Sequence, residues 1–234
     1  MKERPILFSA AMVKAILEGL KTQTRRAVKF PRKREAFVIA EESDGTLWPY
    51  QSDDGESMVC DDGCEHPYSC PFGRPGDRLW VKETWRVSSK YNTTAPAALP
   101  FERGVSIAYS AGGVMCRDAV DGPYVSHPTH DLWDQEWMGK VRPSIFMPRL
   151  ASRITLEVEA VRVERLQDIS EADAIAEGVT IEDIHKIGYG AGENRPPAIR
   201  AYRDLWESIN GAGSWASNPF VWVVQFKRIE HAPD

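Results

Sequence analysis

A long alternating stretch between Ser152 and Arg165 constrains the fold of this chain more than any other feature. Its apolar residues recur at every second position and are Ile154, Leu156, Val158, Val161 and Val163. The polar residues between them predict a strand with one face toward a core and the other toward solvent. Near Ala160 the alternation slips by one residue, as it does at a β-bulge in a curling strand. The chain therefore needs a curved sheet with further strands beside this one.

Other periodic segments can supply those partners. Strand-type patterns occur at residues 5–8, 78–85, 105–109 and 220–229, and the runs 37–40 and 47–48 suit a small hairpin. Apolar spacing and capping patterns predict helices at residues 10–19, 170–178 and 198–209. Two regions with fewer such patterns, about 31–75 and 86–150, are expected to be long insertions. We predict one α+β domain over residues 1–234; periodicity alone does not separate a β-barrel from an antiparallel sandwich.

The charge of the chain is unevenly distributed. The net charge is −5, yet residues 21–34 carry seven basic side chains and no acid, whereas residues 36–73 carry nine acids and no Lys or Arg. A local basic patch suits an anionic ligand such as RNA or a nucleotide, although residues 29–34 also fit a solvated charged loop. No apolar run reaches the ~18 residues of a membrane span, and the N-terminus lacks a signal-peptide pattern. We expect a cytoplasmic protein without a membrane partner.

Four short blocks of the sequence form a set of motifs. The first has the pattern Gly-x-Lys-x-x-Thr-x-Arg and consists of Gly19, Lys21, Thr24 and Arg26. The others are residues 76–81, the helical run from Ile169 to Gly178, and residues 222–226. In this order the blocks resemble the ASCH domain family, whose members are PUA-like β-barrels, and the chain is similar to long members of the family that bacterial prophages carry. This resemblance implies a PUA-like barrel with a cleft, between the first helix and the sheet, for RNA or a modified nucleoside.

The resemblance also implies a catalytic trio. Small bacterial members hydrolyse the acetyl amide of N4-acetylcytidine with a threonine, a lysine and a glutamate, which correspond to Thr24, Lys21 and Glu177. In that mechanism Thr24 is the nucleophile, Lys21 its base, and Glu177 an orienting partner or acid/base for the leaving amine. A free lysine, with a pKa of about 10.4, is a poor base. Burial and the neighbouring Arg25 and Arg26 would lower the Lys21 pKa, whereas a paired Glu177 would raise it, and the sequence leaves this balance open.

Further residues are candidates for contacts with substrate or RNA, and they are Arg25, Arg26, Glu83, Trp85, Arg149 and Arg153. Arg26, or a backbone N–H beside the turn at Gly19, is also a candidate for stabilising an oxyanion. Trp85 could stack on a base, although a tryptophan in a strand is commonly a core residue. Arg149 and Arg153 flank the long strand and could reach a phosphate, or be solvated.

A cysteine- and histidine-rich segment raises the question of a metal. Cys60, Cys64, His66 and Cys70 offer four zinc ligands within eleven residues, but their spacing matches no common zinc motif, so unligated thiols are the alternative. His127, His130 and Asp131 form a second, chance-prone cluster of ligand types. No other cofactor is required by the chemistry considered.

Three functions are compatible with the proposed site. The first is an amidohydrolase acting on N4-acetylcytidine-type substrates. The second is a non-catalytic module that binds RNA or a modified nucleoside, and the third is a ribonuclease that uses the same cleft. The sequence indicates no oligomeric state.

Overall fold

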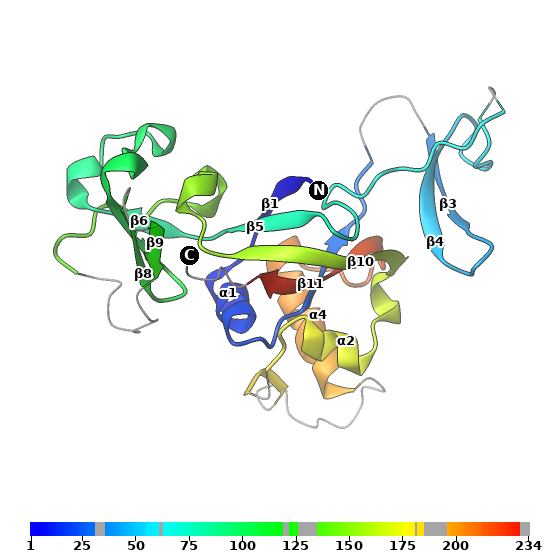
Figure 1. The fold of residues 1–234 in the computed structure, drawn as a ribbon. Helices are drawn as coiled ribbons and strands as arrows, with labels where there is room; N and C mark the ends of the chain where they lie inside the picture. The colour runs from blue at the N-terminus through cyan, green and yellow to red at the C-terminus, as the bar shows by residue number, and fades with distance from the viewer. Residues whose placement is uncertain are drawn as a thin grey trace. The chain divides into compact units, whose positions relative to one another are not determined.

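The computed structural model describes residues 1–30, 36–60, 63–118, 122–125, 135–180, 182–184 and 196–229 (Figure 1). The chain divides into two compact units. Unit 1 comprises residues 1–19, 77–157 and 228–234, and unit 2 comprises residues 20–76 and 158–227. Each unit contains one of the two predicted insertions, 86–150 in unit 1 and 31–75 in unit 2.

Unit 1 begins with the strand β1 (Glu3–Leu7) and the helix α1 (Ala10–Leu17). The side chain of Ser9 caps α1 by accepting a hydrogen bond from the backbone N–H of Met12. After the helix, Gly19 adopts a φ of 74°, a left-handed conformation that glycine takes at little cost. Strand β1 runs parallel to β5 (Arg78–Lys82), and β5 pairs antiparallel with the first residues of β10 (Thr155–Arg165).

The insertion in unit 1 contains a sheet of its own. Strands β6 (Trp85–Val87), β7 (Val105–Tyr109), β8 (Val114–Asp118) and β9 (Gly122–Val125) follow one another in antiparallel order. Short 3-10 helices accompany this sheet at Ser89–Tyr91, Pro96–Ala98, Phe101–Arg103, Ser144–Phe146 and Arg149–Ala151. A hydrophobic cluster that includes Trp85, Ile107 and Met147 fills its core. The predicted strand at 105–109 is confirmed, whereas the sequence did not indicate β8 and β9.

Unit 2 contains the rest of β10 together with β2 (Gln23–Ala27) and all but the last two residues of β11 (Phe220–Ile229), and β11 lies between the other two. Strands β11 and β2 are antiparallel, with Val223 opposite Arg25. The predicted hairpin is confirmed as β3 (Ala36–Glu41) and β4 (Leu47–Ser52), and β4 also pairs with β10. In Figure 1 this hairpin extends away from the helices of the same unit.

Those helices cover one face of the unit 2 sheet. They are α2 (Glu171–Ala176) and α4 (Pro197–Asn210), which lie side by side (Figure 1). Their buried residues, such as Ala174, Tyr202 and Trp206, form one hydrophobic cluster with Val221 and Val223 of β11. The 3-10 helix Leu166–Asp168 connects β10 to the segment that enters α2.

The architecture is mixed α+β, as predicted, and it has more sheet than helix. The long alternating segment forms the single strand β10, in which Leu156, Val158 and Val163 are buried. The buried apolar residues Leu156 and Val158 are even-numbered and Val163 is odd-numbered, which matches the slip in the sequence pattern, and Thr155 at the start of the strand is buried as well. Among the described strands, the pairings close no sheet into a barrel. The described residues include no helix with the length and apolar character of a membrane span.

Candidate functional site

Lys21 and Glu177 meet where the entrance to β2 runs beside the end of α2. The two residues form an isolated antiparallel bridge, and the backbone N–H of Thr22 donates to the carbonyl of Ala176 at 2.9 Å. Ser170 begins α2 by capping the backbone N–H of Asp173, and Glu177 is the residue that ends the helix. Tertiary pairing therefore brings together two residues that are 156 positions apart in the chain.

The side chains of Lys21 and Glu177 form a buried ion pair. Lys21 Nζ donates to Oε2 of Glu177 at 2.8 Å and to the Glu177 carbonyl oxygen at 2.7 Å. The exposed fractions of the two side chains are 0% and 2%, so water screens this pair very little. The structure thus unites two members of the catalytic trio that the sequence predicted.

Burial lowers the pKa of Lys21, and this effect outweighs the opposing attraction and hydrogen bond of Glu177. The nearby charges of Arg26 and Arg25 lower the pKa further, because a third positive charge close to two others is unfavourable. The sequence left open whether burial or Glu177 prevails, and in this structure burial prevails. A lysine in such surroundings can be neutral at a lower pH and accept a proton.

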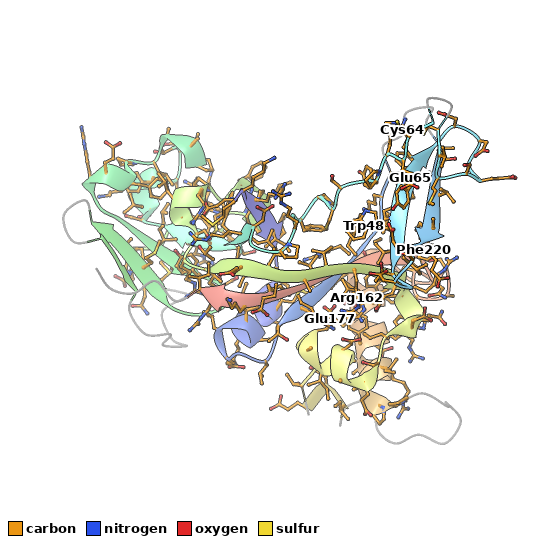
Figure 2. The ribbon with its side chains drawn as sticks, turned by 45° about the vertical axis from the view of Figure 1, so that its right-hand side comes forward. Trp48, Cys64, Glu65, Arg162, Glu177 and Phe220 are labelled. Carbon is orange, nitrogen blue, oxygen red and sulfur yellow. The ribbon has the colours of Figure 1, made fainter. Side chains whose placement is uncertain are left out.

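Arg25 lies on β2 with its guanidinium completely buried among three carboxylates. Its Nε and Nη2 donate to Oε1 of Glu164 at 3.0 and 2.5 Å. Its Nη2 also donates to Oδ2 of Asp173 at 3.0 Å, and its Nη1 donates to Oε1 of Glu177 at 3.3 Å. Arg162 of β10 contacts the first two carboxylates from a more exposed position, at 3.0 Å from Glu164 and 3.3 Å from Asp173. We call these residues and Lys21 the charge cluster, and Figure 2 shows Arg162 and Glu177 in its region.

Two further side chains, Gln23 and Tyr202, interact with this cluster. Gln23 donates to the carbonyl oxygen and to Oδ1 of Asp173 at 2.9 and 3.0 Å. Burial opposes ionisation of Asp173, but Arg25 and the hydrogen bond from Gln23 hold the pKa of Asp173 below its usual value. Tyr202 of α4 is 3% exposed, and burial followed by the negative charge of Glu177 raises the pKa of its hydroxyl.

Thr24 and Arg26 lie on the other face of β2. Successive residues of a strand point to opposite faces, so Thr24 shares a face with its partner Val224, and Arg25 shares one with Val223. Thr24 is buried, with 1% of its surface exposed. Burial lowers the pKa of Arg26 against the opposing charge of Glu177. The structure thus joins Lys21 and Glu177 directly and puts Arg25, rather than Thr24, on the strand face that contacts Glu177.

Sequence analysis did not identify Gln23, Arg162, Glu164, Asp173 or Tyr202 as site residues. A partial signal was present in the sequence. Asp173 and Glu177 are four positions apart, which puts their side chains on one face of a helix, and Arg162 and Glu164 share the polar face of the alternating strand. Those patterns are also typical of solvated surfaces, so only the tertiary contacts identify them.

Glu83 and Arg153, which the sequence suggested as ligand contacts, form a buried ion pair in unit 1. Arg153 Nε and Nη2 donate to the two carboxylate oxygens of Glu83 at 2.9 and 3.0 Å. The two side chains are only 4% and 2% exposed, and the guanidinium carbon lies 4.1 Å from the ring centre of Tyr109. Burial raises the pKa of Glu83, although Arg153 opposes this effect. Both charged groups are therefore engaged with the interior of their own unit.

The other two candidates in unit 1 differ in exposure. Trp85 is 0% exposed and packs in the core of the inserted sheet, with the guanidinium carbon of Arg142 at 5.4 Å from its ring centre. Its ring is thus a core group rather than an exposed stacking surface in this structure. Arg149 lies at the surface and pairs with Glu3 at 2.9 Å.

The cysteine-rich segment follows the β3–β4 hairpin. Cys60 and Cys70 are buried and Cys64 is exposed, and the backbone N–H of Cys60 donates to the carbonyl of Cys64 at 3.0 Å. Figure 2 shows Cys64 at the end of unit 2 remote from Glu177. Within the ranges that the structure describes, no group of three His, Cys, Asp or Glu residues has an arrangement that could hold a metal ion. Zinc bound by Cys60, Cys64, His66 and Cys70 stays a prediction, and His127, His130 and Asp131 lie outside the described residues.

Fold and site together define an α+β protein with a buried lysine–glutamate pair at a strand–helix junction. Comparisons with protein families, with curated proteins and with solved structures found no match to this chain. The features of this chain that bear on its function are therefore the motifs of the sequence and the geometry of the charge cluster.

Proposed function

We propose that the chain is an ASCH-type protein whose unit 2 contains the site of a PUA-like domain. Three of its motif blocks are in contact, which supports this assignment. The block that contains Lys21 enters β2, the block that ends at Gly178 closes α2, and residues 222–226 lie in β11 beside β2. A shared site is a physical reason for these separate blocks to occur in one sequence.

The activity that we propose is hydrolysis of the acyl amide of an N4-acetylcytidine-type nucleoside. The observation that carries the proposal is the buried Lys21 amine, whose pKa is lowered even though Glu177 lies 2.8 Å away. In a purely structural salt bridge the carboxylate would favour the charged form of the lysine, whereas a general base needs a neutral amine that can accept a proton.

The proposed reaction has two stages. The hydroxyl oxygen of Thr24 forms a bond to the acyl carbon and its proton passes to Lys21, while Arg26 stabilises the oxyanion. The carbon–nitrogen bond then breaks, and the Lys21 ammonium returns the proton to the leaving amine. In the second stage a water molecule adds to the acyl ester, which releases the free acid and restores the Thr24 hydroxyl. Glu177 orients Lys21 throughout.

Incubation with N4-acetylcytidine and chromatographic detection of cytidine tests this proposal. Wild type is expected to release cytidine, and Lys21→Ala to lose about 10²–10⁴-fold of the rate, as is typical when a general base is removed. Lys29→Ala is the matched control, because Lys29 is an exposed lysine of the same basic segment. Absence of cytidine above the Lys21→Ala level would exclude this substrate.

The role of Thr24 has a separate test, since Thr24 lies on the strand face opposite Arg25. Thr24→Ala is expected to abolish turnover and Thr24→Ser to retain part of it, because serine keeps the attacking hydroxyl. Full activity of Thr24→Ala beside an inactive Lys21→Ala would instead identify water as the nucleophile.

The charge balance of the site favours a second candidate, a module that binds a nucleotide or RNA without catalysis. Lys21, Arg25 and Arg162 face three carboxylates, and Arg26 adds a further cation next to them. Binding of this kind weakens with salt because phosphate contacts release counterions. Calorimetric titration of cytidine monophosphate at two salt concentrations tests it, and an unchanged affinity, or no binding, would count against this candidate.

A further inference from the structure

The guanidinium of Arg25 connects three different elements of unit 2. Its donors reach Glu164 on β10, Asp173 within α2 and Glu177 at the end of α2. Its side chain is 0% exposed. Turning this group toward a ligand would leave three carboxylates without their shared cation, which is strongly unfavourable in a buried site.

We propose that Arg25 is a positioning residue, which fixes the Glu177 carboxylate so that it orients Lys21, and that Arg25 does not contact substrate or RNA. The catalytic consequence of this inference rests on the proposed amidohydrolase function. The placement of Lys21 that it predicts can be measured without any activity.

The geometry of the Glu177 carboxylate carries this inference. Each of its two oxygens has its own cation, because Oε1 accepts from Arg25 at 3.3 Å and Oε2 accepts from Lys21 at 2.8 Å. Rotation of the carboxylate would break both contacts together. The arginine is in turn fixed by the contacts at 2.5 and 3.0 Å to Glu164 and Asp173. Arg25 thus orients Lys21 through Glu177, and it needs no direct contact with Lys21 to do so.

The charges around Lys21 give Arg25 an electrostatic role as well. Glu177 faces Lys21 from the end of α2, and Arg25 and Arg26 face it from β2. Arg25 also binds Glu177, so its charge both anchors the anion and disfavours the lysine cation.

The outer charged groups complete the surroundings of the pair. Arg25 binds Asp173 of α2 and Glu164 of β10, and Arg162 of β10 also binds Asp173. Tyr202 of α4 interacts electrostatically with Glu177. These groups are the same in the two variants compared below, apart from the residue exchanged. Because the positive charge of Arg25 lowers the pKa of Lys21, removal of that charge should raise the Lys21 pKa.

Arg162 offers a matched comparison for Arg25. It binds the same two carboxylates, Glu164 and Asp173, at 3.0 and 3.3 Å, and the structure gives it no contact with Glu177 among the described residues. Exchange of either arginine for glutamine removes one positive charge from the same cluster. Only Arg25→Gln also removes the support of Glu177.

The test titrates the Nζ of Lys21 by nitrogen-15 NMR in wild type, Arg25→Gln and Arg162→Gln, and measures kcat and KM across pH on N4-acetylcytidine. Arg25→Gln is expected to raise the pKa of Lys21 clearly more than Arg162→Gln does. Its kcat should fall by about 10–100-fold, the range found for outer partners that orient metal ligands, with a smaller change in KM. Its pH–rate profile should move toward higher pH with the Lys21 pKa.

Equal Lys21 titrations in the two glutamine variants would overturn the inference, as would a loss confined to KM, which would indicate substrate contact. If Arg25→Gln does not fold, Arg25→Lys keeps the charge but cannot span Glu164 and Glu177. It is then expected to lower kcat with little shift of the pH profile, and unchanged kcat would again overturn the inference. Wild type that lacks turnover would refute the proposed function, while the NMR comparison would still decide the placement of Arg25.

Discussion

Removal of one partner from the buried Glu83–Arg153 pair should cost more stability than removal of both. Arg153→Met leaves the Glu83 carboxylate inside unit 1 at 2% exposure, without the two hydrogen bonds of 2.9 and 3.0 Å. Breaking a buried pair in this way typically costs about 3–5 kcal/mol, and we expect a loss in that range at pH 7. Glu83→Leu should cost less, because the guanidinium of Arg153 keeps its contact with the ring of Tyr109, a type of interaction worth roughly 0.5–2 kcal/mol.

The double variant Glu83→Leu/Arg153→Met leaves neither charge of this pair in the interior of unit 1. Replacement of both members of a buried pair by apolar residues is often neutral or stabilising. Its free energy of unfolding should therefore lie close to that of wild type, and the sum of the two single losses should exceed the loss of the double variant by about 3 kcal/mol or more. Urea unfolding followed by circular dichroism measures all four proteins at one pH.

A pH series gives an independent check on the sign of this effect. Burial raises the pKa of Glu83 above its reference value of 4.5, and Arg153 opposes this rise. Without Arg153 the native pKa must rise further. A group whose native pKa is raised contributes stability below its unfolded pKa and loses that contribution as the pH rises through the native value. The deficit of Arg153→Met should thus shrink as the pH falls from 7 toward 4.5.

The alternative that the sequence suggested has a different outcome. If Glu83 and Arg153 were exposed for contact with a ligand, their pairing would add little to the free energy of unfolding, since surface ion pairs are worth about 0–1 kcal/mol. A loss of less than 1 kcal/mol for Arg153→Met, or single losses that simply add in the double variant, would refute the reasoning.

Three further predictions concern unit 2. The native pKa of Lys21 is below its unfolded value of 10.5, so the unfolded chain binds more protons between those two values. The stability of wild type relative to Lys21→Met should therefore increase with pH in that window. Urea unfolding at several pH values measures this increase. Gly178 has a φ of 92°, which is unfavourable for a residue with a side chain, so Gly178→Ala should lower the free energy of unfolding by about 1–2 kcal/mol. The same substitution should displace the end of α2 and reduce any release of cytidine. An unchanged thermal midpoint would contradict this prediction. Among the cysteines that follow the hairpin, exposed Cys64 should react with a thiol reagent before buried Cys60 and Cys70, and Cys64→Ser should remove the fastest phase of that reaction.

The sequence by itself determined the elements whose signals are local. The strand β10, the helix α4 (Pro197–Asn210) and the β3–β4 hairpin agree with the predictions, because side-chain periodicity and turn residues act over a few positions. The motif blocks also suggested Lys21 and Glu177 as site residues; the structure brings the two into contact, and their catalytic role stays a prediction. In the insertion of unit 1, by contrast, strands β8 and β9 lack a comparable pattern and form through pairing with their neighbours.

Only the tertiary structure decided which charged residues act together. The sequence suggested Arg25, Glu83 and Arg153 only as candidates for ligand contacts, and the structure gives each of them a buried partner of opposite charge. It also decided the balance at Lys21, where burial outweighs the attraction of Glu177. Charge and spacing are visible in a sequence, but the exclusion of water and the distance between residues more than a hundred positions apart arise only when strands pair and helices pack. Those two quantities set the strength of a charge interaction.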